Sequence, residues 1–299
     1  FIAQEETTHS MNGMEMLEIH EKPSYDVRLT GQIVERIRAA QRPVILAGTG
    51  VRLSKAYEDF LKCIDVLQIP VVTAWNAHDL LWDEHPLYCG RPGSVGNRGG
   101  NFVVQNSDLL LVLGCRMNIR QISYNFKEFA KHAYKIAVDI DEAELHKPTV
   151  NIDLRIHADV ADVMKDIAGK DVEAGNHKEW LRWCRAVNEK YPVTLPSYFE
   201  RQKPLNPYAF IHRFSECLEE GDTVICGNGS ACVVTFQAMQ IKRNQRLFTN
   251  SGCAAMGYGF PAALGCAVAR QEDSVICVDG DGSFQMNLQE LQTVVYNWL

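Results

Sequence analysis

The sequence lacks any dense run of basic residues. Its 299 residues carry 30 Lys and Arg against 37 Asp and Glu, a net charge of −7, so electrostatic capture of nucleic acid is not expected. It also lacks a CxxC pair or a Cys/His cluster at zinc spacing among its 10 cysteines, several of which lie in apolar runs. We therefore predict small buried thiols in a reducing, cytoplasmic compartment.

Membrane and secretion signals are missing as well. The most apolar stretch, residues 254–269, is interrupted by three glycines and Pro261 and is too short to span a bilayer. The polar opening "FIAQEETTHS" has no signal-peptide pattern. We expect no membrane partner. Because neither terminus shows a cap or tail pattern, we expect the chain to be part of a longer protein.

What is present is an alternation of short apolar runs with helical periodicity. Strands are predicted at residues 44–47, 69–73, 109–113, 135–140 and near 155, and Thr30 is a candidate cap for the first helix. A second series places strands at 223–226, 246–249 and 274–278, between helices at 207–218, 257–269 and 287–296. Strands that alternate with helices indicate parallel sheets covered on both faces.

The predicted fold class is therefore α/β, with two doubly wound, Rossmann-like parallel-sheet domains, the second truncated. We predict an opening segment (1–29), a central nucleotide-binding-like domain (30–168), a proline-punctuated linker (169–206) and a second domain (207–299) that is incomplete at its C-terminus.

The sharpest motif is "DGDGS" at residues 279–283, between a buried strand and a helix. Asp281 would supply a hard oxygen ligand to Mg²⁺. Gly280 and Gly282 would let the backbone approach a diphosphate, and Ser283 would add an amide and a hydroxyl. A plain turn is the alternative, although a hairpin turn needs a strand on both sides and the following residues have helical spacing.

Two further motifs follow predicted strands. In "CGNGSACVV", the loop at Gly229 leads to amides of Ser230 and Ala231 that could bind phosphate, although turn geometry alone also explains such residues. In "NSGCAAMGYGFPAALG", small residues allow close approach of a ring, and Met256 is either a cofactor contact or a filler of the core.

Together, the three motifs resemble the cofactor-binding half of the thiamine diphosphate (ThDP) enzymes, and "MGYGFPAALG" with "GDGSF" most resembles the acetolactate synthase-like group. The resemblance makes residues 207–299 the diphosphate-binding domain and Asp281 the Mg²⁺ ligand. It implies that Met256 bends the cofactor and that the Ala254 carbonyl accepts a hydrogen bond from its 4′-amino group. The implied cofactor-binding residues are Gly229, Ser230, Ala231, Ala254, Met256, Gly280, Gly282 and Ser283.

The resemblance extends to "PVILAGTGV", "SDLLLVLGCRMNIR" and "AVDIDEAELHK", which look like the central domain of the same enzymes. That domain holds FAD in some members and ADP or nothing in others. Where the synthases carry two aspartates, this chain has Asn118 and Ile119, so all three states stay open. The alternative interpretation is that the aspartates cap helices and the arginines form surface ion pairs. The matching positions are Gly48, Gly50, Arg116, Arg120, Asp139, Asp141 and Asp159.

The resemblance implies an enzyme that decarboxylates a 2-oxo acid or joins an acyl donor to an acceptor, working as a homodimer or homotetramer. The alternative is a non-catalytic nucleotide-binding or regulatory module. The family's activating glutamate is expected before Phe1, since Glu5 and Glu6 lie in no matching motif, and its Asn pair is expected beyond Leu299. We therefore expect residues 1–299 alone to bind ThDP poorly and to catalyse nothing. If this piece alone turned substrate over, Glu290, on the helix after the "GDG" turn, would be the first candidate for the activating glutamate.

Overall fold

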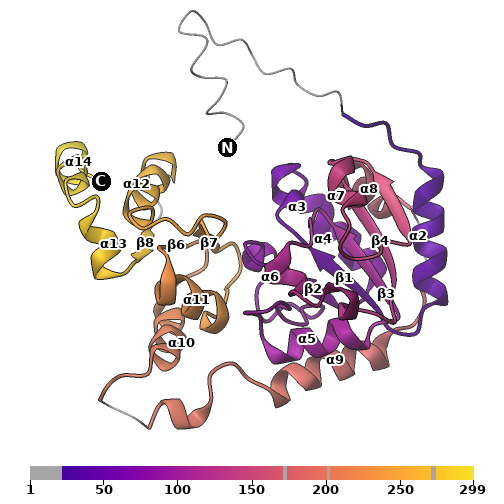
Figure 1. Cartoon of the computed structure of the whole chain (residues 1–299), viewed down its shortest axis with the longest axis horizontal. Coiled ribbons are helices and arrows are strands. Elements are labelled where there is room, and N and C mark those ends of the chain that lie inside the picture. Colours follow the sequence, from indigo (N-terminus) through magenta and orange to yellow (C-terminus); the bar gives the residue numbers. More distant parts are fainter. Residues whose placement is uncertain (1–21, 171–173, 201–202, 271–273) are drawn as a thin grey trace, which may run out of the picture.

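The computed structural model describes residues 22–170, 174–200, 203–270 and 274–299. Most of the predicted opening segment, including Glu5 and Glu6, lies outside these residues, as do five positions of the predicted linker. The chain forms two parallel sheets, each accompanied by helices, and the second is shorter (Figure 1). The predicted α/β class with two parallel-sheet domains is confirmed.

The first sheet has the strand order β2-β1-β3-β4-β5, and all of its pairings are parallel. Every residue of β1 and β3 is buried, because these central strands are covered on both faces. The strands are β1 (Pro43–Ala47), β2 (Val71–Thr73), β3 (Leu109–Leu113), β4 (Tyr134–Asp139) and β5 (Leu154–His157).

Helices with one apolar stripe cover this sheet. In α2 (Arg28–Ala39), the buried residues include Ile33, Val34 and Ile37 at helical spacing. The predicted cap at Thr30 is wrong: α2 begins two residues earlier because Leu29 N–H already bonds the Asp26 carbonyl at 2.9 Å, and Thr30 is buried inside the helix. The other elements are α3 (Gly50–Leu53), α4 (Tyr57–Leu67), α5 (Arg98–Asn106), α6 (Ile119–Ile122), α7 (Glu142–His146), α8 (Val160–Ala168) and the 3₁₀ turns η1 (His78–Leu80) and η2 (Phe126–Glu128).

Helix α9 (Lys178–Lys190) runs along the first domain beside α5, and the chain then passes through η3 (Pro196–Tyr198) to the second domain (Figure 1). The second sheet has the parallel order β7-β6-β8. Its elements are α10 (Pro207–Cys217), β6 (Thr223–Cys226), α11 (Gly229–Ala238), β7 (Arg246–Thr249), α12 (Gly259–Arg270), β8 (Val275–Val278), α13 (Asp281–Gln285) and α14 (Glu290–Asn297).

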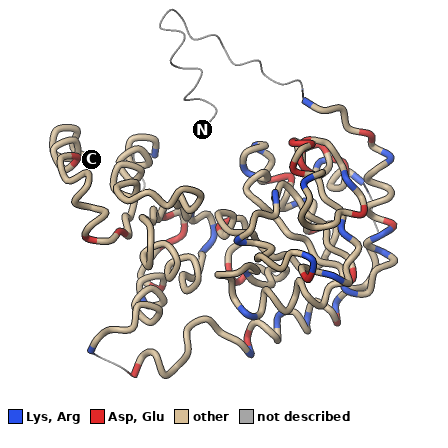
Figure 2. Tube along the Cα trace, in the orientation of Figure 1, with Lys and Arg blue, Asp and Glu red and all other residues tan. Residues whose placement is uncertain are grey.

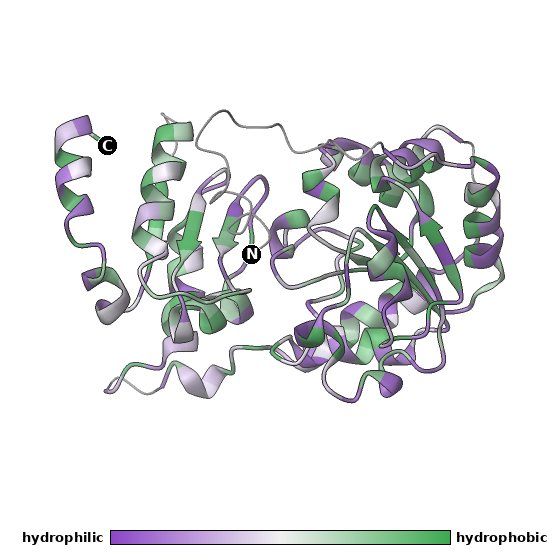
Figure 3. Ribbon diagram, turned by 45° about the horizontal axis from the view of Figure 1, so that its top comes forward, coloured by the Kyte–Doolittle hydropathy of each residue, from purple (hydrophilic) through white to green (hydrophobic). Residues whose placement is uncertain are grey.

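The distribution of hydrophobic and hydrophilic residues follows this architecture. Green, hydrophobic strands lie at the centre of each sheet, while the helices alternate green and purple (Figure 3). Lys and Arg are interspersed with Asp and Glu along α2 and α9, without a continuous basic strip in the described part of the chain (Figure 2). Within the described ranges, no helix is long and apolar enough to cross a membrane.

Candidate functional site

All three cofactor motifs lie at one edge of the second sheet. Strands β6, β7 and β8 run parallel, so their carboxyl ends meet, and each is followed by one of the three motifs. Ligands of open α/β sheets bind at this edge because helix N-termini and flexible loops meet there. The sequence-predicted cofactor residues are therefore brought together from three separate segments.

The motifs after β7 and β8 are hydrogen-bonded to each other through Gly257. Its N–H donates to Ser283 Oγ at 2.8 Å, and its carbonyl accepts from Asn287 Nδ2 at 2.6 Å. Ser283 is buried, and its hydroxyl keeps one proton to donate. The structure thus gives Ser283 a role in joining two loops, and its contact with a diphosphate stays a prediction.

Asp279, which the sequence reasoning did not select, packs against the other two motifs. A Cβ on Gly227 would lie 1.7 Å from Asp279 Oδ1, and a Cβ on Gly259 would lie 2.5 Å from Asp279 Oδ2. Only glycine fits at both positions. Asp279 Oδ1 accepts the Gly280 N–H at 2.9 Å, whereas Oδ2 is buried without a hydrogen-bond partner. The signal in the sequence was a glycine directly after β6 and an aspartate directly after β8.

Met256 is 46% exposed, so it does not fill the core of this chain. Its Cε lies 3.5 Å from where a Cβ of Gly282 would be, which places it against the "GDG" turn. Asp281 is also exposed. Both side chains are therefore accessible to a bound molecule at the edge of the sheet.

The backbone at this edge is open at two of the predicted glycines. A Cβ on Gly229 or Gly280 would meet nothing within 4 Å, and the first turn of α11, with Ser230 and Ala231, has no side-chain cap. Free amides at a helix N-terminus bind phosphate oxygens. These residues fit a diphosphate. For Mg²⁺ the chain offers the Asp281 carboxylate, and the described residues contain no cluster of three acidic, His or Cys side chains.

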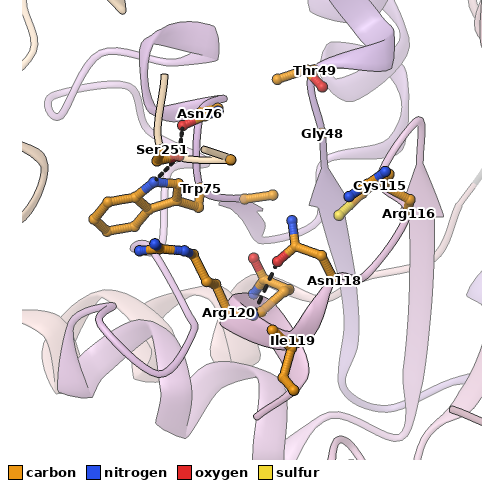
Figure 4. Close-up of a pocket in the computed structure, with 13 residues that line it drawn as sticks. Gly48, Thr49, Trp75, Asn76, Cys115, Arg116, Asn118, Ile119, Arg120 and Ser251 are labelled. Carbon is orange, nitrogen blue, oxygen red and sulfur yellow. Dashed lines mark hydrogen bonds between the residues drawn. The ribbon is translucent and has the colours of Figure 1, made fainter. Parts of the chain in front are cut away.

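A second candidate site is a cavity of about 340 Å³ between the two domains (Figure 4). Trp75 Nε1 donates to Ser251 Oγ at 2.7 Å, and Ser251 Oγ donates to Asn76 Oδ1 at 2.8 Å. Arg120 lies beside the indole, with its Cζ 6.0 Å from the ring centroid. Burial raises the pKa of the Cys115 thiol to about 11, so this group is neutral at pH 7.

The lining of this cavity carries two arginines and no carboxylate. It is formed by Gly48, Thr49, Ala74, Trp75, Asn76, Cys115, Arg116, Asn118, Ile119, Arg120, Gln121, Ser251 and Gly252. An anionic ligand with a planar ring suits this combination of guanidinium groups and indole. Trp75, Asn76 and Ser251 were not predicted, because their proximity depends on how the domains pack.

The other predicted nucleotide residues lie outside this lining. Gly50 packs on Gly114, since its Cβ would lie 2.6 Å from the Gly114 Cα. Asp141 and Asp159 cap α7 and α8 by accepting the N–H of the residue two positions later, each at 2.8 Å. Asp139 accepts the Asp141 N–H at 3.1 Å, and burial raises the pKa of its carboxyl. A nucleotide contact of these four residues stays a prediction.

One ion pair and one buried arginine connect the two domains. Arg246 Nε of β7 contacts Asp79 Oδ2 at 2.6 Å. Arg91 Nη2 contacts Asp83 Oδ2 at 2.8 Å, and Arg91 Nη1 donates to the Met239 carbonyl at 2.9 Å. Arg91 is 4% exposed, so its guanidinium group is shielded from water. The segment after β2 therefore contacts the second domain through Asp79 and Arg91, and also through Trp75, whose ring stacks on Phe236.

Fold and site together define an α/β protein with two candidate ligand sites, one at the edge of its second sheet and one between its domains. Known proteins agree with this class. The family model "Thiamine pyrophosphate enzyme, central domain" matches residues 30–167, and "Thiamine pyrophosphate enzyme, C-terminal TPP binding domain" matches residues 227–299. The chain belongs to the thiamine pyrophosphate enzyme family.

Its relatives include a probable acetolactate synthase large subunit of Methanococcus aeolicus, 34% identical over 280 residues, which are 88% of this chain and 46% of the relative. The acetolactate synthase isozyme 1 large subunit of Escherichia coli (strain K12) is 33% identical over 277 residues, which are 93% of this chain and 48% of the relative. The chain thus spans about half the length of these relatives. The predicted resemblance to the acetolactate synthase-like group is confirmed.

Proposed function

We propose that the full-length protein is a ThDP- and Mg²⁺-dependent enzyme that decarboxylates a 2-oxo acid or transfers its acyl group, as in an acetolactate synthase. The observation that carries the proposal is the meeting of the three motifs at one sheet edge, two of which are joined through Gly257. ThDP supplies a thiazolium ring that stores the electrons released beside the substrate carbonyl. No feature of the described residues or of the comparisons favours the alternative, a non-catalytic nucleotide-binding module.

This chain's own residues would bind and orient the cofactor. The α11 amides and Ser230 would hold the diphosphate, and Asp281 would hold the Mg²⁺ that offsets its charge. Met256 and the Ala254 carbonyl would support the bent form that the family uses. Since Met256 and Asp281 are exposed here, a dry site needs another protein surface over them. We infer that a pyrimidine-binding domain covers this edge in a homodimer or homotetramer.

Ten free thiols suit the reducing cytoplasm, where we place the protein.

The first test of this function is Asp281→Ala in the full-length protein. We expect the affinity for ThDP at saturating Mg²⁺ to fall at least about tenfold, because a charged contact to the metal and diphosphate is lost. Isothermal calorimetry measures the affinity, and Glu220→Ala, at an exposed position of the same domain, is the control. An unchanged affinity in Asp281→Ala would remove this residue from the metal site.

Two substitutions of Met256 distinguish a role in supporting the cofactor from a role in folding. We expect Met256→Leu to keep substantial turnover, since it preserves most of the volume, and Met256→Ala to reduce turnover about tenfold or more. Thermal unfolding should change little in either variant, because the side chain is 46% exposed. A large loss of stability in Met256→Ala, with normal turnover of the folded fraction, would contradict this role.

For the cavity between the domains, we propose a nucleotide ligand, either FAD or ADP. A bound flavin would show directly in the visible spectrum of the purified protein. If ADP binds instead, we expect a stabilisation of about 2.7 kcal/mol at a concentration 100 times its Kd. Thermal unfolding with ADP measures this, and Arg120→Gln should diminish it while Arg213→Gln, on exposed α10 surface, should not. If neither flavin absorbance nor stabilisation by ADP is observed, the first domain has a structural role only.

A further inference from the structure

The carbonyl of Ala254 is held by a side chain from another cofactor motif. Asn228 Nδ2 donates to the Ala254 oxygen at 3.2 Å, and the two residues are 26 positions apart. Ala254 has φ +53°, in the left-handed region that is costly for a residue with a side chain. Its N–H bonds the Asn250 carbonyl at 2.9 Å. The N–H and the carbonyl of Ala254 are therefore both hydrogen-bonded while its backbone has an unfavourable conformation.

Asn228 makes this contact instead of the helix-capping hydrogen bond that asparagine usually makes at this position. It occupies the position before the first residue of α11, with φ −99° and ψ −176°. At such a position, asparagine normally accepts a hydrogen bond from an amide of the first helical turn. Its side chain makes no capping bond here and reaches the turn after β7 instead. The contact with Ala254 thus replaces a local interaction and leaves the α11 amides free.

We propose that Asn228 is a positioning residue for the aminopyrimidine end of the cofactor. By holding the Ala254 oxygen, it presents this acceptor to the 4′-amino group that the family resemblance assigns to it. A carbonyl has two lone pairs, so it can accept from Asn228 and from the amino group at the same time. The inference rests on the proposed function and adds a residue that links the diphosphate loop to the aminopyrimidine.

The test compares two ligands that differ at the position concerned. Oxythiamine diphosphate has an oxygen where ThDP has the 4′-amino group, and so lacks that donor. Asn228→Asp keeps the shape of the side chain and loses its N–H donors, while Asn228→Ser is uncharged and can cap α11. In both full-length variants, we expect the ThDP affinity to fall about fivefold to tenfold and the oxythiamine diphosphate affinity to change less. The added charge of Asp acts on both diphosphates alike, so the ratio of affinities isolates the 4′ position.

Asn106→Asp is the matched control, because Asn106 Nδ2 donates to the Phe102 carbonyl at 2.8 Å on the exposed surface of α5, in the other domain. We expect it to leave the ratio unchanged, and thermal unfolding identifies any variant that fails to fold. Equal losses for both ligands in the Asn228 variants, or the same change of ratio in Asn106→Asp, would overturn the positioning role. If the unmodified full-length protein binds no ThDP, the proposed function fails, and this inference fails with it.

Discussion

In Gly227→Ala, we expect the affinity of the full-length protein for ThDP to fall at least about tenfold. The new methyl group would lie 1.7 Å from Asp279 Oδ1 and 2.5 Å from Asp279 Cγ. The other oxygen of this carboxylate faces Gly259, so a shift of Asp279 that relieves the contact changes its packing against a second loop. Overpacking of this kind costs about 1–3 kcal/mol, and here the strain separates the loops that follow β6 and β8. Calorimetric titration with ThDP and Mg²⁺ measures the effect.

Gly265→Ala is the matched control, since a Cβ at this position of α12 meets nothing within 4 Å. Alanine is the better helix former, so we expect this variant to be as stable as the unmodified protein or up to about 1 kcal/mol more stable. Gly259→Ala should behave like Gly227→Ala, because its Cβ would lie 2.5 Å from Asp279 Oδ2. Normal ThDP binding by both variants would show that Asp279 does not set the spacing of the loops.

Arg91→Leu is expected to destabilise the full-length protein by about 2–4 kcal/mol. The substitution leaves Asp83 without its cation and the Met239 carbonyl without its donor, at an interface from which the arginine excludes water. Urea unfolding measures the change in the free energy of unfolding. Arg213→Leu, which breaks an exposed ion pair with Glu216, should cost at most about 1 kcal/mol. Similar effects of the two substitutions would mean that Arg91 does not hold the domains together.

The destabilisation by Arg91→Leu should grow with pH. Burial already raises the pKa of the Asp83 carboxyl, and Arg91 opposes that rise. Without the arginine, the pKa of Asp83 in the folded state rises further above its unfolded value of about 3.9. A raised folded pKa gives stability that is complete below the unfolded pKa and is lost as pH rises through the folded pKa. Urea unfolding at about pH 5 and pH 7.5 should therefore show the smaller effect at the lower pH, and a pH-independent effect would contradict this assignment.

The sequence alone was sufficient to predict the strands of both sheets and to locate the three motif loops of the second domain. The strands at residues 109–113, 223–226 and 246–249 have the predicted bounds. For the first two the reason is that a strand buried on both faces is a continuous apolar run in the sequence. The glycines after β6 and β8 marked the loops for another local reason. A backbone that approaches a ligand closely favours residues without side chains. The cap predicted at Thr30 failed, since neighbouring residues extended the helix.

Only the tertiary structure decided which residues these loops bring together. Asp79 and Arg246 are 167 positions apart, and Trp75 and Ser251 are 176 apart, yet both pairs help to form the space between the domains. Asp279 fits only because Gly227 and Gly259, from two other segments, lie against it. No local pattern encodes such contacts. Secondary structure follows from periodicity and conformational preference over a few residues, whereas these distances depend on how two sheets twist and pack against each other.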